Sequence, residues 1–483
     1  MQKSLFTLAA LALLGGCSLA PQYQRPAAPV TPTWPAGDAY KGLPAAAADA
    51  RPVSEIQWRE YFADQRLRQV IELALANNRD LRVSVLNIER ARAQYDVSSA
   101  PLLPTISASG GQSASRTPKS LSTTGEAFIN RQYSAGVGLS AYEIDLFGRV
   151  RNASEAGLQS YLGTEEARRT QQISLVAEVA NAWLTLTADQ QRLKLAQDTL
   201  KSQQTTYDLS RRRFDAGATS GVNVYDAQTS VETARNDVAT YTAQVALDQN
   251  ALTLLVGGTV PETLLPEGEL VAVTELTALP GSLPSELLTR RPDVQQAERA
   301  LRAANANIGV ARAAFFPSIT LTASGGSASR DLSGLFKSGS GTWSFSPQIN
   351  LPIFNNGLNR ANLDIARADR DISVAQYEKA IQVAFREVAD ALATRGTIDE
   401  RLNSQQALVD AAEKSFKIND ARYRRGADTY LNALISQRAL YTAQQGLITT
   451  RLTQTSNAVT LYKVLGGGWQ PEPAQAQGQP PSG

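Results

Sequence analysis

The feature that most constrains this sequence is an internal duplication that covers most of its length. Residues 179–182 (VANA) recur as 388–391 (VADA), and residues 213–218 (RFDAGA) recur as 422–427 (RYRRGA), in both cases 209 positions later. A unit of about 200 residues is too long for a solenoid repeat, so the sequence predicts two structurally equivalent halves. We place repeat 1 at residues 61–270 and repeat 2 at residues 271–469.

Each half contains a very long helical stretch. No proline occurs between Pro118 and Pro261, or between Pro352 and Pro471. Apolar residues recur there at every seventh position, which is the pattern of coiled-coil packing, although Arg395 and Gln454 interrupt it. In the first half these residues are Val179, Leu186, Leu193, Leu200, Tyr207 and Phe214, then Val224, Val231, Val238, Val245 and Leu252.

Glycine-containing turns divide each helical stretch into a hairpin. The predicted turns are Asp215–Gly221 in the first half and Arg425–Tyr430 in the second. A helix from about 150 to 214 would be roughly 100 Å long, at 1.5 Å per residue. No ordinary globular core needs such a length, because helices average about 11–12 residues. The hairpins are therefore expected to span a distance much longer than a globular core.

Each half also contains two predicted β-strands. Residues 133–141 and 343–351 alternate apolar with small or polar side chains, and their predicted partners are residues 105–116 and 318–330. Segments of about ten residues with one apolar and one polar face are typical of membrane β-barrels. A half-buried sheet of a soluble protein is the alternative.

Because one chain supplies only four strands, we expect several copies of the chain to assemble into one barrel. About eight strands is the smallest membrane barrel, and unpaired edges are not tolerated in lipid. Two copies would give eight strands and an interior filled by side chains, whereas three would give twelve strands and a lumen. The small side chains of the polar faces favour three copies.

The N-terminus is a targeting segment. Residues 1–16 have a positive start and a short apolar run, which predicts a signal peptide. Cys17 follows Leu14-Gly15-Gly16 and resembles the lipidated cysteine of a bacterial lipobox, with Ser18 as an outer-membrane sorting residue. Residues 17–60 are proline-rich and predict an extended tether, and residues 470–483 predict a disordered tail.

Composition excludes several kinds of chemistry. The chain has no histidine and one cysteine, so a Ser-His-Asp triad, a Cys-His pair and a Cys/His zinc cluster are excluded. The balance of 47 basic and 45 acidic residues argues against nucleic-acid binding. A phosphate-binding GxxxxGK[ST] loop is absent. Glu143 and Asp145 could form a catalytic carboxylate pair, but a structural or capping role is favoured.

The chain resembles the TolC-like outer-membrane factor family, and most closely its OprM-like lipoprotein subgroup of multidrug efflux channels. The residues that carry the resemblance are 17–19 (CSL), 21–23 (PQY), 78–81 (NRDL), 142–148 (YEIDLFG), 290–293 (RRPD), 313–319 (AAFFPSI) and 465–469 (LGGGW). The resemblance implies an α+β membrane protein. It implies a homotrimer with a 12-strand barrel, four strands per chain, standing on an antiparallel α-helical barrel in the periplasm of a Gram-negative cell. It implies as partners a periplasmic adaptor and an inner-membrane transporter of the resistance-nodulation-division type.

The resemblance also implies a periplasmic gate beside the hairpin turns. Leu431 corresponds to an apolar constriction, and Asp226 to an acidic position after the first turn. The repeat mate of Asp226 is Ile435, where relatives carry Asp, so Asp428 is considered as a substitute acid. The other positions that hold the closed state are Arg422, Tyr423 and Arg438, and the adaptor would dock at Gly217, Gly221 and Gly426.

The turn arginines also have a simpler interpretation. Arg211, Arg212, Arg213, Arg422, Arg424 and Arg425 could merely neutralise the negative helix C-termini before the two glycines.

The expected function is a passive outer-membrane duct of a tripartite efflux system for drugs or solvents, opened by an iris-like shift of the hairpins. We expect no enzyme activity and no cofactor, apart from the covalent lipid on Cys17. The alternatives are a conduit of an ATP-driven protein secretion system and a coiled-coil surface lipoprotein that forms no channel.

Overall fold

The computed structural model describes residues 18–41, 53–268, 270, 273–274 and 285–468. Cys17, the rest of the predicted signal peptide and the predicted C-terminal tail lie outside the described residues. The chain divides into two compact units. Unit 1 comprises residues 1–27, 87–165 and 296–378, and unit 2 comprises residues 28–86, 166–295 and 379–483. Each unit draws on both halves of the sequence.

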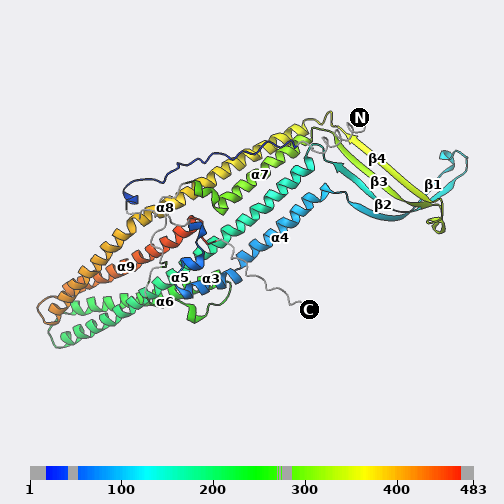
Figure 1. The fold of residues 1–483 in the computed structure, drawn as a ribbon. Helices are drawn as coiled ribbons and strands as arrows, with labels where there is room; N and C mark the ends of the chain where they lie inside the picture. Colours follow the sequence, from blue (N-terminus) through cyan, green and yellow to red (C-terminus); the bar gives the residue numbers. More distant parts are fainter. Residues whose placement is uncertain (1–17, 42–52, 269, 271–272, 275–284, 469–483) are drawn as a thin grey trace, which may run out of the picture. The chain divides into compact units, whose positions relative to one another are not determined.

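The same series of elements occurs twice along the chain (Figure 1). The first series is α4 (Arg79–Ser99), β1 (Ile106–Thr117), β2 (Phe128–Ile144), α5 (Arg149–Asp215) and α6 (Gly221–Val256). The second is α7 (Pro292–Ala313), β3 (Ser318–Ser329), β4 (Gly341–Asn350), α8 (Leu358–Arg424) and α9 (Tyr430–Val464). Helices α5 and α8 each have 67 residues, which agrees with the length predicted from the proline-free stretches.

Within unit 1, β1–β4 form one antiparallel sheet in sequential order. The register separates the side chains into two faces. One face is mainly apolar and carries Ile106, Ala108, Tyr133, Ala135, Val137, Leu139, Tyr142, Ile144, Ile319, Leu321, Ala323, Trp343, Phe345, Pro347 and Ile349. Toward the β1–β2 and β3–β4 connections the same face also carries Gln112, Arg116, Arg131, Ser327 and Ser329. The other carries Ser107, Ser109, Ser134, Gly136, Gly138, Thr320, Thr322, Ser324, Gly326, Ser344, Ser346 and Gln348.

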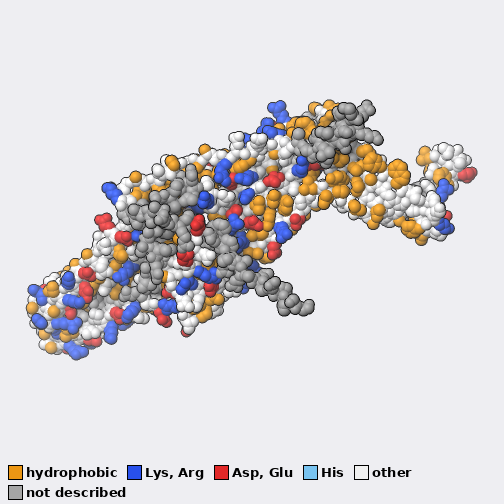
Figure 2. Space-filling model, in the orientation of Figure 1, with side chains coloured by type: hydrophobic (Ala, Val, Ile, Leu, Met, Phe, Trp, Pro, Cys, Tyr) orange, Lys and Arg blue, Asp and Glu red, His pale blue; other side chains and the backbone are white. Residues whose placement is uncertain are grey.

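Large side chains on the apolar face are open to the surroundings, since Trp343 is 82% and Ile349 69% exposed. Charged side chains are sparse along the strands on the side drawn in Figure 2 and frequent on the hairpin helices.

The strict alternation predicted for residues 133–141 is wrong at its end. Leu139 pairs with Ala323 and Tyr142 with Leu321, so two residues of β2 oppose Thr322 alone. Ala141 takes a positive φ of 51°, and its N–H donates to the Thr322 hydroxyl. Such a β-bulge inserts one residue and restores the register beyond it. Tyr142 and Ile144 therefore rejoin the apolar face, and β2 extends further than predicted.

Unit 2 is built from the long hairpins and a small group of elements packed on them. This group contains α2 (Trp58–Tyr61) and α3 (Gln65–Asn77), whose apolar residues join those of α5, α6 and α9 in one core. Tyr61 and Tyr462 stack at its centre, with ring centroids 4.0 Å apart. Among the described residues, no helix is both long and apolar enough to cross a membrane.

Candidate functional site at the hairpin turns

The two hairpin turns have the same backbone geometry. Gly217 and Gly426 both take φ of +72°, the left-handed conformation that favours glycine after a helix C-terminus. The N–H of Gly217 donates to the carbonyl of Phe214, and that of Ala218 donates to Arg213. Gly426 and Ala427 make the equivalent bonds to Tyr423 and Arg422. Gly221, the third predicted docking residue, begins α6.

Tyr423 connects the second hairpin to the first. It is 5% exposed, and its hydroxyl lies 3.1 Å from the hydroxyl of Ser210 on α5. Its ring contacts Tyr430 at a centroid distance of 5.4 Å, in a cluster with Ala227, Ala433 and Leu434. The predicted gate residue Tyr423 is therefore a buried contact between hairpins.

Arg213, from the first hairpin, holds the same end of α8. Its guanidinium carbon lies 4.8 Å from the centre of the Tyr423 ring. Nη2 donates to the carbonyl of Arg424 at 2.9 Å, and Nη1 donates to the carbonyl of Tyr423 at 3.4 Å. Arg213 thus combines a cation–π contact with hydrogen bonds to the negative C-terminus of a helix.

The other predicted charges do not form a single network. Arg422 binds Asp428 within its own turn, with Nε 3.0 Å from Oδ2. Asp428 also accepts from Thr429 N–H and the Asn432 side chain, each at 2.8 Å. The Asn432 and Thr429 hydrogen bonds, together with Arg422, hold the pKa of Asp428 below its usual range. The considered substitute acid is therefore engaged in stabilising the second turn.

Asp226 and Arg438 have opposite effects on the pKa of the Tyr430 hydroxyl. Burial raises the pKa of Tyr430 to about 12, and Arg438 lowers while Asp226 raises it. Within the described part of the chain, neither charge forms an ion pair. Leu431 and Ile435, one turn apart on α9, are each 56% exposed. The structure thus brings Arg422, Tyr423 and Asp428 together around the second turn and leaves Leu431 and Arg438 at the surface.

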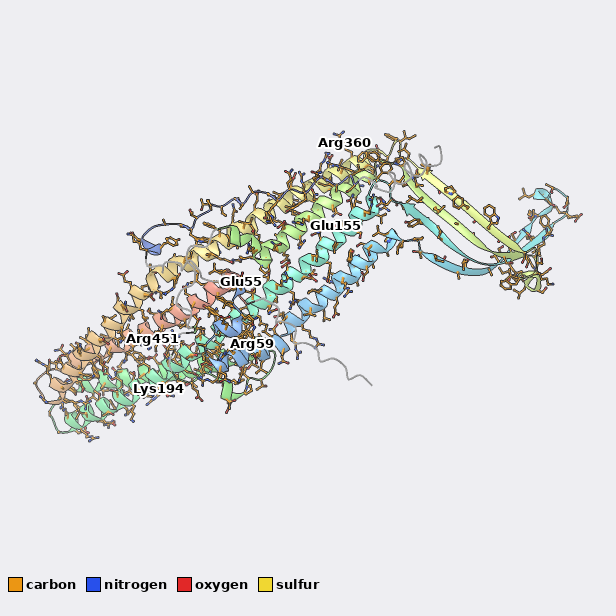
Figure 3. The ribbon with its side chains drawn as sticks, in the orientation of Figure 1. Glu55, Arg59, Glu155, Lys194, Arg360 and Arg451 are labelled. Carbon is orange, nitrogen blue, oxygen red and sulfur yellow. The ribbon has the colours of Figure 1, made fainter. Side chains whose placement is uncertain are left out.

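Further polar contacts join the two hairpins away from the turns. Tyr441 on α9 donates to Asp237 on α6 at 3.0 Å, and Arg192 on α5 donates to Thr449 on α9 at 3.0 Å. Figure 3 labels Lys194 on α5 and Arg451 on α9, the two helices that the Arg192–Thr449 contact joins.

Two carboxylates are buried between α5 and α6. Asp189 is 4% and Asp248 9% exposed, and Arg192 forms an ion pair with Asp189. Gln244 donates to Oδ1 of Asp248 at 2.9 Å, whereas the buried Oδ2 has no hydrogen-bond partner. Burial, followed by the neighbouring Asp189, raises the pKa of Asp248 to about 6.

Three comparisons with known proteins identify the family and the fold of this chain. The family model described as "Outer membrane efflux protein" matches residues 70–258 and 283–467. The chain belongs to the outer membrane efflux protein family. The toluene efflux pump outer membrane protein TtgC of Pseudomonas putida is 51% identical over 480 residues, covering 99% of this chain and 98% of the relative. The antibiotic efflux pump outer membrane protein ArpC of Pseudomonas putida has the same identity and coverage.

The fold is that of an outer-membrane efflux channel. The open state of the MtrE outer membrane channel of Neisseria gonorrhoeae superposes with a TM-score of 0.84 at 37% identity, covering 94% of this chain and 99% of that one. The predicted family and the predicted α+β channel fold are confirmed.

In this outer membrane efflux protein, the carboxylates considered for catalysis bind arginines. Glu143 binds Arg149, and Asp145 accepts from the N–H of Arg151 at 2.8 Å, in the first turn of α5. Asp145 therefore satisfies a helix N-terminus. Within the described residues, no cluster of three or more acidic side chains could hold a metal ion.

Arg213 is the contact that sequence reasoning missed. Its position before a helix-ending glycine predicts a role at helix C-terminal carbonyls, and it does bind such carbonyls. They belong to α8 of the other hairpin, however, and a local pattern gives no sign of which hairpin is contacted.

Proposed function

We propose that this chain is the outer-membrane duct of a tripartite efflux system that exports solvents and antibiotics. The observation that carries the proposal is the sheet of unit 1, with one mainly apolar face and one face of mainly small polar side chains. Apolar side chains facing lipid and small polar ones facing water are what a membrane channel wall requires.

The duct is a homotrimer in this proposal. Among the described strands, β1 and β4 are sheet edges without a further partner. Because lipid cannot satisfy their backbone groups, neighbouring copies must pair with both edges. Three copies supply twelve strands and leave a lumen lined by Ser, Thr and Gly side chains.

The names of the relatives support the proposed solutes and partners. The names of TtgC and ArpC assign them to toluene and antibiotic efflux pumps. We infer the same solute classes here, with energy supplied by an inner-membrane transporter of the resistance-nodulation-division type. A periplasmic adaptor would dock at the turns around Gly217, Gly221 and Gly426. Beside the first turn, Val222 is 67% and Tyr225 71% exposed, which supports a docking surface.

We infer that the chain is held in the outer membrane also by a lipid on Cys17, and that it performs no reaction and needs no cofactor. An acyl chain contributes about 0.8 kcal/mol per buried methylene, so several chains give firm attachment.

Deletion of the chromosomal copy tests the transport function. Susceptibility to toluene and to several antibiotics is expected to rise several-fold and to return to the starting level with a plasmid copy. Unchanged susceptibility to every compound, with loss of one secreted protein instead, would favour the protein secretion alternative.

The periplasmic gate is proposed at Asp226, Arg422, Tyr423, Asp428, Leu431 and Arg438. Asp226 and Arg438 have no ion-pair partner within the described chain, which supports contacts to a neighbouring copy in the closed trimer. Opening would be an iris-like shift of the hairpins driven by the adaptor. Replacing Asp226, Arg422 and Arg438 together with Ala should raise the conductance in planar bilayers. A channel that stays closed in this variant would refute the gate.

A further inference from the structure

A hollow interrupts the mainly apolar face of the sheet. It has a volume of about 480 Å³, and the side chains that form its floor are small, with Ala108 on β1, Ala135 on β2 and Gly325 on β3. A Cβ added at Gly325 would meet nothing within 4 Å, although its partner on β4, Trp343, is large and 82% exposed. We call this cavity the lipid-side hollow, because it opens on the face that the proposed duct turns to the membrane.

The β3–β4 connection folds over the same face and forms one rim of the hollow. The Ser327 hydroxyl donates to the carbonyl of Leu335, and the Ser340 hydroxyl donates to the same carbonyl at 2.9 Å. Leu335 is 7% exposed, whereas the next residue, Phe336, is 81% exposed and lines the hollow. Hydrogen bonds of the connection therefore hold an aromatic side chain beside an unfilled apolar space.

Two arginines lie on the same face, between the hollow and the connections. Arg131 on β2 is opposite Ala114 on β1, and Arg116 is two residues further along β1. Such diagonal neighbours lie about 7–8 Å apart. Both side chains are exposed, and within the described residues neither forms an ion pair or a hydrogen bond. Arg131 is four residues from Ala135, or roughly 13 Å along the strand.

This end of the sheet carries an excess of positive charge. Residues 112–134 and 327–343 contain five basic and two acidic side chains, namely Arg116, Lys119, Arg131, Arg330 and Lys337 against Glu126 and Asp331. Glu126 is already paired with Lys119 at 3.3 Å. Figure 2 shows basic side chains at this end, beyond the mainly apolar strands. The charge therefore favours an anionic partner.

The arginines lie at the height of a lipid head group. Ten residues separate Ile106, near the α4 end of β1, from Arg116, beside the β1–β2 connection. They span about 33 Å of strand, or roughly 23–27 Å along the membrane normal at the usual tilt of 35–45°. The apolar band of an outer-membrane barrel is about 25 Å tall. If Ile106 lies at one boundary of this band, Arg116 and Arg131 lie at the other.

We propose that the two arginines and the lipid-side hollow form one site for a phosphorylated, multiply acylated glycolipid. Arg116 and Arg131 bind its phosphates, since guanidinium and phosphate form paired N–H···O bonds, and one acyl chain fills the hollow. The inference rests on the proposed outer-membrane duct. In that duct the two connections lie on the outer side, and phosphorylated glycolipids make up the outer leaflet of a Gram-negative cell.

Native mass spectrometry of the full-length channel, purified in detergent and stripped of lipid, tests the site. The probes are hexa-acylated lipid A with two phosphates and, at equal concentration, phosphatidylglycerol. Arg116→Ala combined with Arg131→Ala should weaken lipid A binding about 25-fold, because each arginine near an anionic lipid contributes about a factor of five. Lys119→Ala is the matched control, since Glu126 already neutralises that charge in the same hairpin.

Gly325→Leu tests the hollow separately. The added side chain has room to project into it, so folding and melting temperature should be unchanged while lipid A binding falls at least fivefold. Unchanged binding in Gly325→Leu would refute an acyl chain in the hollow, and unchanged binding in the double arginine variant would refute the phosphate site. Equal retention of phosphatidylglycerol and lipid A by the wild type would overturn the glycolipid as the occupant.

Conductance in planar phospholipid bilayers keeps this site and the duct distinguishable. The double arginine variant should conduct as the wild type does, because both arginines lie on the face opposite the small polar side chains. A wild-type chain that forms no channel refutes the duct, whereas a conducting channel without affinity for lipid A refutes only the glycolipid site.

Discussion

Arg213 is one of three consecutive arginines at the end of α5. Of these three, Arg213 is the one with described hydrogen bonds to the second hairpin. Its guanidinium binds two carbonyls of α8 and stacks on Tyr423. Hydrogen bonds to charged groups contribute about 1.5–3 kcal/mol, and a cation–π contact about 0.5–1 kcal/mol at an exposed site. One side chain therefore couples the two hairpins.

We expect Arg213→Ala to separate the hairpin ends and to raise channel conductance in planar bilayers. Arg213→Lys should be intermediate, because lysine keeps the charge but lacks the planar fork that binds two carbonyls. Arg211→Ala is the matched control, since its guanidinium contacts Tyr207 of its own helix. Equal conductance in the Arg213 and Arg211 variants would contradict the coupling role.

Asp248 gives a pH dependence to the same hairpins. Its pKa is about 6 in the folded protein and 3.8 ordinarily, so the folded state binds this proton more tightly. Stability therefore falls as pH rises from about 4 to 6, and the full cost, on the order of 3 kcal/mol, persists above pH 6.

Asp248→Asn should accordingly raise the melting temperature by a few degrees at pH 7.5 and by little at pH 4. Asp198→Asn, an exposed carboxylate paired with Lys194, serves as the control and should change neither value appreciably. The measurement is calorimetry in detergent at both pH values. A gain that is the same at both would show that Asp248 does not carry the pH dependence.

At the scale of elements, periodicity predicted most of the architecture. Seven-residue spacing and missing prolines indicated both hairpins, and the helix-ending glycines placed the turns within a residue or so of residues 216–220 and 425–429. The bulge at Ala141 could not be predicted, because alanine gives no sign of a positive φ. Nor could the contacts of residues 18–25 with α7, since proline-rich sequence predicts an extended chain but not its binding partner.

The contact between β2 and β3 depends on glycine on the polar face only. A Cβ at Gly326 would lie 2.3 Å from the carbonyl oxygen of Ala135, whereas a Cβ at Gly325 would meet nothing within 4 Å. These adjacent glycines point to opposite faces of the sheet. Gly326→Ala must therefore displace backbone, and a loss of about 1–3 kcal/mol is expected.

The test compares Gly326→Ala with Gly325→Ala as its neighbour control. Gly326→Ala should lower the melting temperature of the detergent-purified channel and the amount recovered from outer membranes. Gly325→Ala should behave as the wild type. Comparable losses in both variants would mean that general glycine flexibility, and not close strand approach, is the cause.

For the whole molecule, we infer the number of copies from the two edges of the sheet and from the side chains of its polar face. In the proposed assembly, edge pairing continues from β4 of one copy to β1 of the next until the wall closes. Two copies would enclose a space that side chains normally fill, yet the polar face offers mainly Ser and Gly, whose side chains are too small to fill it. Three copies leave a water-filled lumen, which suits these residues.

Cysteine cross-linking between edges can count the copies, because Cys17 is the only cysteine of the chain. Single cysteines are placed along β1 at Ser107, Ser109 or Ser113 and combined with one on β4 at Ser344 or Ser346, and oxidation is followed on denaturing gels. At the paired register, the products should stop at three chains. Chains with only the β1 or only the β4 cysteine are the controls, since like edges do not meet in a closed ring. A series that stops at two chains, or continues beyond three, would contradict a trimeric wall.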